Sequence, residues 1–160
     1  PKFMNFLNLI TKNNFFVVIG NMDYYGGNRD APVYQNLNLS MENYDNLIIG
    51  LTHGHQVSPR GDHSQLELIS IEKSFNILIS GHTHKEEIFL QNDILLLNPG
   101  SVTGAWSFIA SGNPSFITLS IIEKTGEITL VLYQYDIRAT KFKDIKSYFV
   151  FENNKIRHKY

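Results

Sequence analysis

Residues 75–85 read Phe-Asn-Ile-Leu-Ile-Ser-Gly-His-Thr-His-Lys, an apolar run that ends in a glycine and two histidines. A short apolar run of this kind is typical of a strand buried on both faces, as in a parallel sheet. We therefore predict a buried strand over Phe75–Ile79 whose carboxyl end delivers Gly81-His82-Thr83-His84.

The same arrangement occurs twice more. Leu47–Ile49 is followed by Thr52-His53-Gly54-His55, and the apolar run Phe15–Ile19 is followed by Gly20-Asn21-Met22-Asp23. Open α/β sheets place their sites at the carboxyl ends of strands, so these side chains should meet at one edge. Imidazole nitrogens together with amide or carboxylate oxygens favour Mn, Fe or Zn.

The clustering of the histidines distinguishes this pattern from ordinary polar residues. A single histidine is usually a satisfied surface or core group, and His63 and His158 are interpreted in that way. Five of the six histidines, however, lie between positions 53 and 84, and four of them form two His-x-His pairs. This favours a metal site. Asn98-Pro99-Gly100-Ser101, taken alone, is compatible with a simple turn.

Helical spacing occurs at two places. Phe3, Phe6, Leu7 and Ile10 recur at positions i, i+3, i+4 and i+7, which predicts a short amphipathic helix at the start. Asp62 stands three residues before Gln65, as in a capping box, and predicts a helix to about Lys73 with an apolar side formed by Leu66, Leu68 and Ile69.

Antiparallel strands fill most of the remaining sequence. We predict a loop over Tyr24–Pro32 and then a hairpin between the alternating Leu37, Leu39 and Met41 and the strand at Leu47–Ile49. Asn92-Asp93 indicates a turn between Ile88–Leu90 and Ile94–Leu97. A last hairpin joins Ser115–Ile122 to Glu127–Tyr135. The elements together indicate an α/β sandwich.

Composition limits the possible functions. With 160 residues, of which 42% are hydrophobic, the chain fits one compact domain. Its 14 Lys and Arg against 15 Asp and Glu leave no basic surface for nucleic acid. The absence of cysteine excludes disulfides and thiolate ligands and favours a cytoplasmic protein. Apolar runs such as Phe15–Ile19 are too short to cross a membrane.

Four motifs in order, Gly-Asn-x-Asp, Thr-His-Gly-His, Gly-His-Thr-His and Asn-Pro-Gly-Ser, resemble the later motifs of the calcineurin-like metallophosphoesterases, including the YfcE-type phosphodiesterases. Within that superfamily, Thr52–Val57, Ile77–Lys85 and Asn98–Ala105 are most similar to the small subunit of retromer, a membrane-coat complex of vacuolar protein sorting. The likeness covers residues 1 to about 135.

The resemblance implies an αββα sandwich and a set of site residues. The metal ligands would be Asn21, His53, His82 and His84, with Asp23 and His55 lining the site. The metal would be Zn or Mn, either functional or vestigial. The family's first two motifs have no match, so we expect a single domain over 1–160 whose N-terminal βαβ part is missing from this chain.

Two functions follow from the resemblance. The first is a non-catalytic retromer scaffold in endosomal sorting, because Met22 stands where many hydrolytic members have a general-acid histidine and a thioether cannot transfer a proton. The second is a metal-dependent phosphodiesterase of the YfcE type, because YfcE-type members also lack that histidine.

Partner contacts are also implied by the resemblance. The large helical-solenoid subunit of retromer would meet the loop after His-Gly-His, at Val57, Ser58, Pro59 and Arg60, and Val57 is expected to be exposed. Endosomal regulators would meet a patch at Thr118 and Tyr133, although Tyr133 could equally be an ordinary strand residue. The protein would then be cytoplasmic and reach endosomal membranes only through partners.

The sequence beyond Asp136 is locally basic and longer than the usual ending of the family. We consider two interpretations for 136–160: a solvated final strand and tail, or a segment attracted to an anionic membrane surface. The basic residues are Arg138, Lys141, Lys143, Lys146, Lys155, Arg157 and Lys159.

Overall fold

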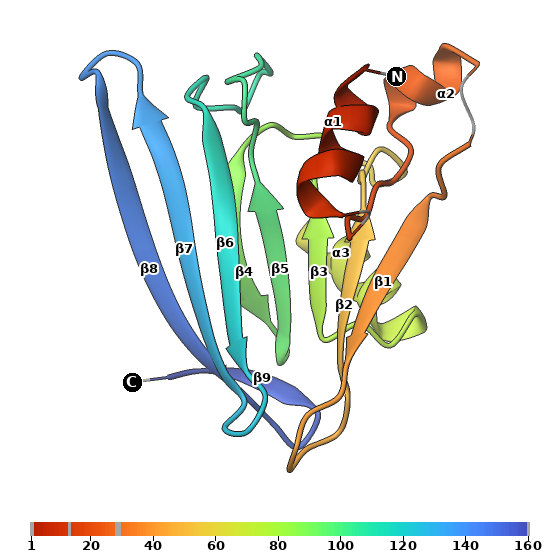
Figure 1. Ribbon diagram of the computed structural model, residues 1–160, viewed down its shortest axis with the longest axis vertical. Coiled ribbons are helices and arrows are strands. Elements are labelled where there is room, and N and C mark those ends of the chain that lie inside the picture. The colour runs from red at the N-terminus through yellow and green to blue at the C-terminus, as the bar shows by residue number, and fades with distance from the viewer. Residues whose placement is uncertain (1, 13, 28–29, 160) are drawn as a thin grey trace.

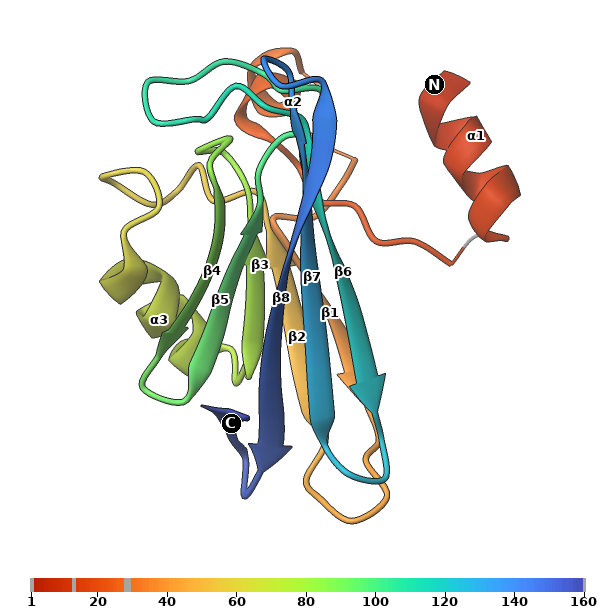
Figure 2. The ribbon, with the colours of Figure 1, turned by 90° about the vertical axis from the view of Figure 1, so that its left-hand side faces the viewer.

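The computed structural model describes residues 2–12, 14–27 and 30–159. Two β-sheets lie face to face, and helix α3 covers the outer face of the first (Figures 1 and 2). The predicted mixed α/β sandwich is confirmed. None of the helices in the described part of the chain is long and apolar enough to cross a membrane.

The first sheet has five strands in the order β1-β2-β3-β5-β4. Its strands are β1 (Tyr34–Leu39), β2 (Leu47–Thr52), β3 (Ile77–Ser80), β4 (Glu86–Gln91) and β5 (Ile94–Pro99). Strands β2, β3 and β5 are parallel, whereas β1 and β4 run antiparallel to their neighbours. The strand predicted around Phe75–Ile79 and both hairpins of this sheet are therefore confirmed. Asn92 and Asp93 turn β4 into β5 with φ of 48° and 67°, angles suited to a tight hairpin.

Helix α3 (His63–Glu72) forms as its cap predicts, since Asp62 Oδ1 accepts a hydrogen bond of 2.9 Å from Gln65 N–H. Leu66 is buried beneath it with Phe75, Leu78 and Leu96. Leu68 was expected on the apolar side but is 64% exposed. Gly50 of β2 explains the close fit on this face, because a Cβ there would lie 2.2 Å from the Phe75 ring.

The second sheet has the order β6-β7-β8-β9 and is antiparallel throughout. Its strands are β6 (Ser115–Ile122), β7 (Glu127–Asp136), β8 (Lys141–Glu152) and β9 (Lys155–His158). Side chains alternate between the two faces, and the inward ones pack against the first sheet in one core. The hairpin predicted at β6 and β7 is confirmed.

The basic C-terminal segment is more than a solvated tail. Phe149, Phe151 and Ile156 are at most 1% exposed and belong to the core between the sheets. Burying each such side chain contributes about 1.5–3 kcal/mol. Lys143, Lys155 and Lys159 form ion pairs with carboxylates, and the Lys155–Asp93 pair, at 2.8 Å, reaches the first sheet. Strands β8 and β9 are thus part of the sandwich.

The strand predicted over Phe15–Ile19 is wrong. This segment is not a strand, and Phe16 and Val17 are 45% and 38% exposed. Ile19 N–H donates to Pro32 O at 2.9 Å, but Val17 N–H bonds the side chain of Gln35 instead of a neighbouring backbone. Apolar composition alone does not make a strand where no continuous ladder forms.

Helix α1 (Lys2–Thr11) confirms the predicted first helix. Figure 2 shows α1 standing away from both sheets, and Phe6 and Ile10 are 54% and 56% exposed. The side chain of Phe3 lies outside the described residues. A short helix α2 (Asn21–Tyr25) follows, and its last two residues overlap the loop predicted over Tyr24–Pro32.

Candidate functional site

Two parallel strands deliver the histidines to one edge of the first sheet. Thr52 of β2 is level with Ser80 of β3, so His53 and Gly81 leave the sheet side by side. Gly81 N–H donates to His53 O at 3.0 Å and extends the ladder one step beyond the strands. Asn21, at the start of α2, joins them from a different part of the chain.

The side chains of Asn21, His53 and His82 converge on one point. His53 Nε2 lies 3.0 Å from Asn21 Oδ1 and 3.2 Å from His82 Nδ1. The two imidazole rings meet edge to face, with centroids 5.0 Å apart. Two ligands about 2.0–2.1 Å from one zinc ion at tetrahedral angles stand about 3.3 Å apart. Both separations from His53 Nε2 therefore fit those of neighbouring ligands of one divalent metal.

His84 lies at the same edge and has a defined tautomer. Its Nδ1 is 3.1 Å from Trp106 O, and because a carbonyl oxygen only accepts, Nδ1 carries the proton. Nε2 is then left with its lone pair. Metal-binding histidines are commonly oriented by such a bond from the other ring nitrogen to a backbone carbonyl. His84 is thus prepared to act as a ligand, although the structure does not bring it into the three-atom cluster.

Burial keeps the cluster neutral. The pKa of His82 is lowered to about 4, mainly by desolvation and further by the charge of Arg60 and the neighbouring histidines. Burial also lowers the pKa of His53, helped by His55 and His84. Both imidazoles are uncharged at neutral pH. His53 Nε2 donates to Asn21 Oδ1 here, so it would bind a metal in the other neutral tautomer.

The two residues expected to line the site behave differently. The His55 ring lies 5.6 Å from that of His53 and 6.5 Å from that of His82, and its buried Nδ1 has no hydrogen-bond partner among the described residues. An orphaned polar atom beside the cluster fits a site that takes a polar ligand. Asp23 Oδ2 instead accepts from Gly20 N–H at 3.0 Å and caps its own turn.

The loop that carries His82 and His84 is strained and firmly held. Both histidines have left-handed backbones, with φ of 69° and 59°, a conformation that non-glycine residues adopt at a cost of about 1–3 kcal/mol. Asn98 Nδ2 donates to Gly81 O at 3.1 Å and to Thr83 Oγ1 at 2.9 Å. Ser107 Oγ donates to Thr83 O at 2.5 Å.

Sequence reasoning missed Asn98 and Ser107 as supports of the site. The signal available for Asn98 was its position before Pro99-Gly100 at the end of a buried strand. Ser107 carried no comparable signal.

Within the described ranges, no three His, Asp or Glu side chains are grouped to hold a metal ion. The third donor of the cluster is the amide oxygen of Asn21, and the nearby carboxylate of Asp23 is engaged elsewhere. The donor set therefore consists of nitrogen and amide oxygen, which suits Zn²⁺ or Mn²⁺.

The loop after His-Gly-His is only partly exposed. Ser58, Pro59 and Arg60 face solvent, as expected of a contact loop. Val57, expected to be exposed, is 3% exposed and packs in the core with Leu66 and Phe75. That expectation was wrong because the turn after Gly54 directs Val57 beneath α3.

The patch around Tyr133 lies on the outer face of the second sheet. Tyr133 stacks on Phe116 across the β6–β7 ladder, with ring centroids 4.9 Å apart. Thr118 pairs with Val131 one step along. The ring of Tyr133 lines a mostly apolar groove of about 300 Å³ together with Val102, Pro114, Ser115, Phe116, Tyr135 and Phe142.

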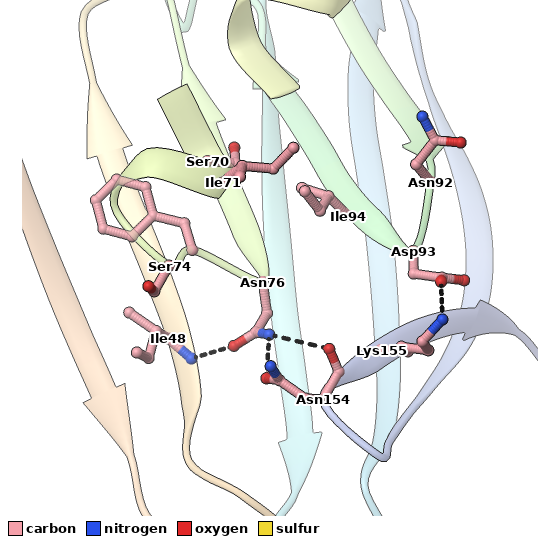
Figure 3. Close-up of a pocket in the computed structure, with 11 residues that line it drawn as sticks. Ile48, Ser70, Ile71, Ser74, Asn76, Asn92, Asp93, Ile94, Asn154 and Lys155 are labelled. Carbon is pink, nitrogen blue, oxygen red and sulfur yellow. Dashed lines mark hydrogen bonds and ion pairs between the residues drawn. The ribbon is translucent and has the colours of Figure 1, made fainter. Parts of the chain in front are cut away.

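A second cavity, of about 430 Å³, lies where the parallel strands of the first sheet begin, at the end opposite to the histidines (Figure 3). Asn76 Oδ1 accepts from Ile48 N–H and its Nδ2 donates to Asn154 Oδ1, both at 2.8 Å. Together with the Lys155–Asp93 ion pair, these bonds fasten the β8–β9 turn to the first sheet. Asn76 is paired with Asn154, and Asp93 with Lys155, which indicates a structural role for these four side chains.

Comparison with known protein families identifies the chain. Residues 1–124 match the model of the calcineurin-like phosphoesterase superfamily domain, and the chain belongs to that superfamily. A probable metallophosphoesterase of Methanocaldococcus jannaschii is 44% identical over 86 residues, which cover 54% of this chain and 40% of that protein. The chain thus matches less than half the length of this curated relative.

Among solved structures, the chain is similar to Vps29 proteins of this superfamily. Vacuolar protein sorting 29 of Cryptosporidium parvum is 33% identical with a TM-score of 0.75, and the match covers 94% of this chain and 76% of that one. Wild-type Vps29 of Entamoeba histolytica complexed with Zn²⁺ is 32% identical with a TM-score of 0.65, over 82% and 68% of the two chains. The resemblance predicted from the motifs is confirmed.

Proposed function

We propose that this protein is a scaffold subunit of retromer, which binds the large helical-solenoid subunit and endosomal regulators and reaches endosomal membranes through those partners. The observation that carries the proposal is the similarity to Vps29 over nearly the whole chain, at 33% identity. The site itself supports it. Met22 follows Asn21, the proposed metal ligand, and is 75% exposed, and its thioether cannot donate a proton to a leaving group.

The metal has a defined place in this proposal. Asn21, His53 and His82 would hold a divalent ion, with His84 as a further ligand through Nε2. When bound, such an ion would supply charge for organising the polar edge of the site. Asn98 and Ser107 keep the histidine loop in its strained backbone, and burial keeps His53 and His82 neutral.

The solenoid contact would use the exposed part of the loop after His-Gly-His, at Ser58, Pro59 and Arg60. The regulator contact would use the aromatic groove at Phe116 and Tyr133, because aromatic-lined grooves are suited to extended or proline-containing peptide segments. The two surfaces lie on different sheets and could be occupied together.

Co-purification with the C-terminal solenoid of the large retromer subunit tests the proposal. We expect the wild type to be retained and the Arg60→Glu variant to be retained less, because a reversed charge at the contact opposes docking. The matched control is Lys141→Glu, which reverses an exposed charge on β8 in the second sheet. Equal retention of both variants and the wild type would remove the loop from the contact.

A metal-dependent phosphodiesterase is the second candidate. The convergence of Asn21 Oδ1, His53 Nε2 and His82 Nδ1 favours it, since a metal held there could bind a phosphate oxygen. Metal-dependent turnover of a phosphodiester that is lost in His82→Ala, together with no retention of the solenoid by the wild type, would decide for this candidate.

A further inference from the structure

Strand β8 is longer than the strand that covers its outer side. Residues 141–150 pair with β7, whereas β9 pairs only with residues 149–152. Residues 141–147 are here called the open edge, because no strand in the described part of the chain lies on their other side (Figure 1). Along this stretch β8 is the last strand of the second sheet.

The backbone of the open edge presents hydrogen-bonding groups to a further strand. Tyr148 O accepts from Lys159 N–H at 2.9 Å, on the side away from β7. In an antiparallel strand, alternate residues direct N–H and C=O to the same side. The register with β7 is uninterrupted, so Phe142, Asp144 and Lys146 direct these groups outward as Tyr148 does. They form a continuous row of donors and acceptors.

The side chains of the open edge are mainly basic. The edge carries Lys141, Lys143 and Lys146 against a single acid, Asp144, and all four are exposed. Lys143 pairs with Asp136 at 2.6 Å, whereas Lys141 and Lys146 form no ion pair with a described residue. Two uncompensated positive charges thus lie beside the row of free backbone groups.

This charge selects among the strands that could pair here. Lysines at a free edge protect it against unwanted pairing, because they repel the like-charged edge of a second copy of β8. The same lysines attract carboxylates. Ile145 and Tyr148, 58% and 48% exposed, offer apolar contacts on the two faces of the strand. The occupant that the charge favours is an acidic segment in extended conformation.

We propose that the open edge binds an acidic, extended segment of another protein, which adds to the second sheet as a further strand beside β8. The backbone of the segment pairs with that of the open edge, and its carboxylates meet Lys141 and Lys146. The contact uses the edge of β8 and not the aromatic groove around Phe116 and Tyr133. It therefore goes beyond the proposed scaffold function.

Fluorescence anisotropy with the labelled peptide Glu-Val-Glu-Val-Glu-Val-Glu tests the proposal. The wild type should bind this peptide but not the peptide with lysine in place of glutamate. Lys146→Glu should weaken binding roughly fivefold, because it reverses a charge at the contact. Lys124→Glu, which reverses an exposed charge in the β6–β7 turn, should bind as the wild type does. No binding by the folded wild type at up to about 1 mM protein would overturn the proposal.

A proline variant separates strand addition from simple charge attraction. The N–H of Asp144 faces the open side, so Asp144→Pro removes an edge donor and leaves the ladder with β7 intact. It should bind roughly tenfold more weakly than Asp144→Asn, which changes only the side chain. A fully N-methylated peptide, which keeps its charges but has no backbone donors, should not bind the wild type. Equal binding in either comparison would overturn the added strand.

Other occupants would give different results. Loss of peptide binding in Tyr133→Ala would place the peptide in the aromatic groove and overturn the proposal. A dimer of the protein alone that separates in Asp144→Pro, measured by light scattering, would assign the edge to a second copy instead. Co-sedimentation with phosphatidylserine vesicles that is lost in Lys146→Glu, without binding of the peptide, would assign the positive charge to a lipid surface and overturn the proposal as well.

Discussion

His53 Nε2 lies 3.2 Å from His82 Nδ1, although 29 residues separate the two histidines in the sequence. The distance follows from the parallel pairing of β2 with β3, which places the residues after both strands at the same edge of the sheet. Asn21 Oδ1 reaches the same nitrogen of His53 from a third segment. The fold thus assembles a donor set that no single segment contains.

Removal of a cluster histidine should remove metal binding. We expect the wild type to bind Zn²⁺ or Mn²⁺ in a calorimetric titration and His82→Ala to lose most of the heat, since one of the converging donors is gone. His63→Ala, which changes a histidine bonded to Glu87 away from the cluster, should bind as the wild type does. Equal heats for wild type and His82→Ala would exclude the cluster as the metal site.

The metal-free protein should lose stability in mild acid through His82. Its pKa is lowered from 6.5 to about 4, so between these values the unfolded chain binds a proton that the folded protein does not. The stability contributed by neutral His82 is present above about pH 6.5 and is lost as the pH falls towards 4. Thermal melts in EDTA should show a drop in Tm from pH 7 to pH 4.5 that is smaller in His82→Gln. The same drop in both proteins would contradict this.

Val57 should behave as a core residue. Val57→Asp places a carboxylate among Leu66, Phe75 and Leu78, and an unpaired charge there should cost several kcal/mol of the free energy of unfolding. Ser58→Asp, one residue away and exposed, should change that free energy by less than about 0.5 kcal/mol. Chemical denaturation of the two variants measures the difference, and a stable Val57→Asp protein would show that Val57 is not buried.

Asn98 should matter for both stability and metal affinity. Asn98→Ala removes the Nδ2 donor that joins Gly81 O to Thr83 Oγ1, and each acceptor then keeps only a backbone N–H donor. The loss of two hydrogen bonds should cost about 1–3 kcal/mol and loosen the loop of His82. Asn38→Ala on the exposed face of β1 is the control and should change neither quantity. If Asn98→Ala kept wild-type metal affinity, the loop would not depend on this side chain.

Phosphomonoester hydrolysis should be negligible. Met22 cannot act as a general acid, a role that typically contributes about 10²–10⁴-fold, so turnover with Mn²⁺ should lie far below the common range of roughly 1–10³ s⁻¹. Met22→His, which introduces a titratable group beside Asn21, is the informative comparison. Turnover of the wild type within the common range would refute the scaffold interpretation of the site.

Local patterns predicted most strands and the capped helix, because alternation, turn residues and capping groups act over a few positions. Asp62 accepts from Gln65 N–H at the start of its helix, and Asn92 and Asp93 adopt the backbone of their turn, as the local pattern predicted. Phe15–Ile19 failed because a strand also needs a continuous ladder, which no local pattern shows. Phe149 and Phe151 were missed because their burial depends on the distant first sheet.

In the site, too, local patterns were predictable and long-range contacts were not. His53 and His82 were found from residue type and position after strands. Asn21 was found by the same argument although the strand predicted before it does not form, and the structure brings its side chain to His53. The burial of Val57 and the bond between His84 and Trp106 depend on how loops fold back, and neither leaves a periodic signal.

The most direct measurement is size-exclusion chromatography with light scattering of the wild type mixed with the C-terminal solenoid of the large retromer subunit. The scaffold account predicts a complex of one copy of each chain that elutes ahead of both components and persists in EDTA or in the presence of Zn²⁺. Two separate peaks at the masses of the free components, from a protein whose melting curve shows that it is folded, would contradict the account.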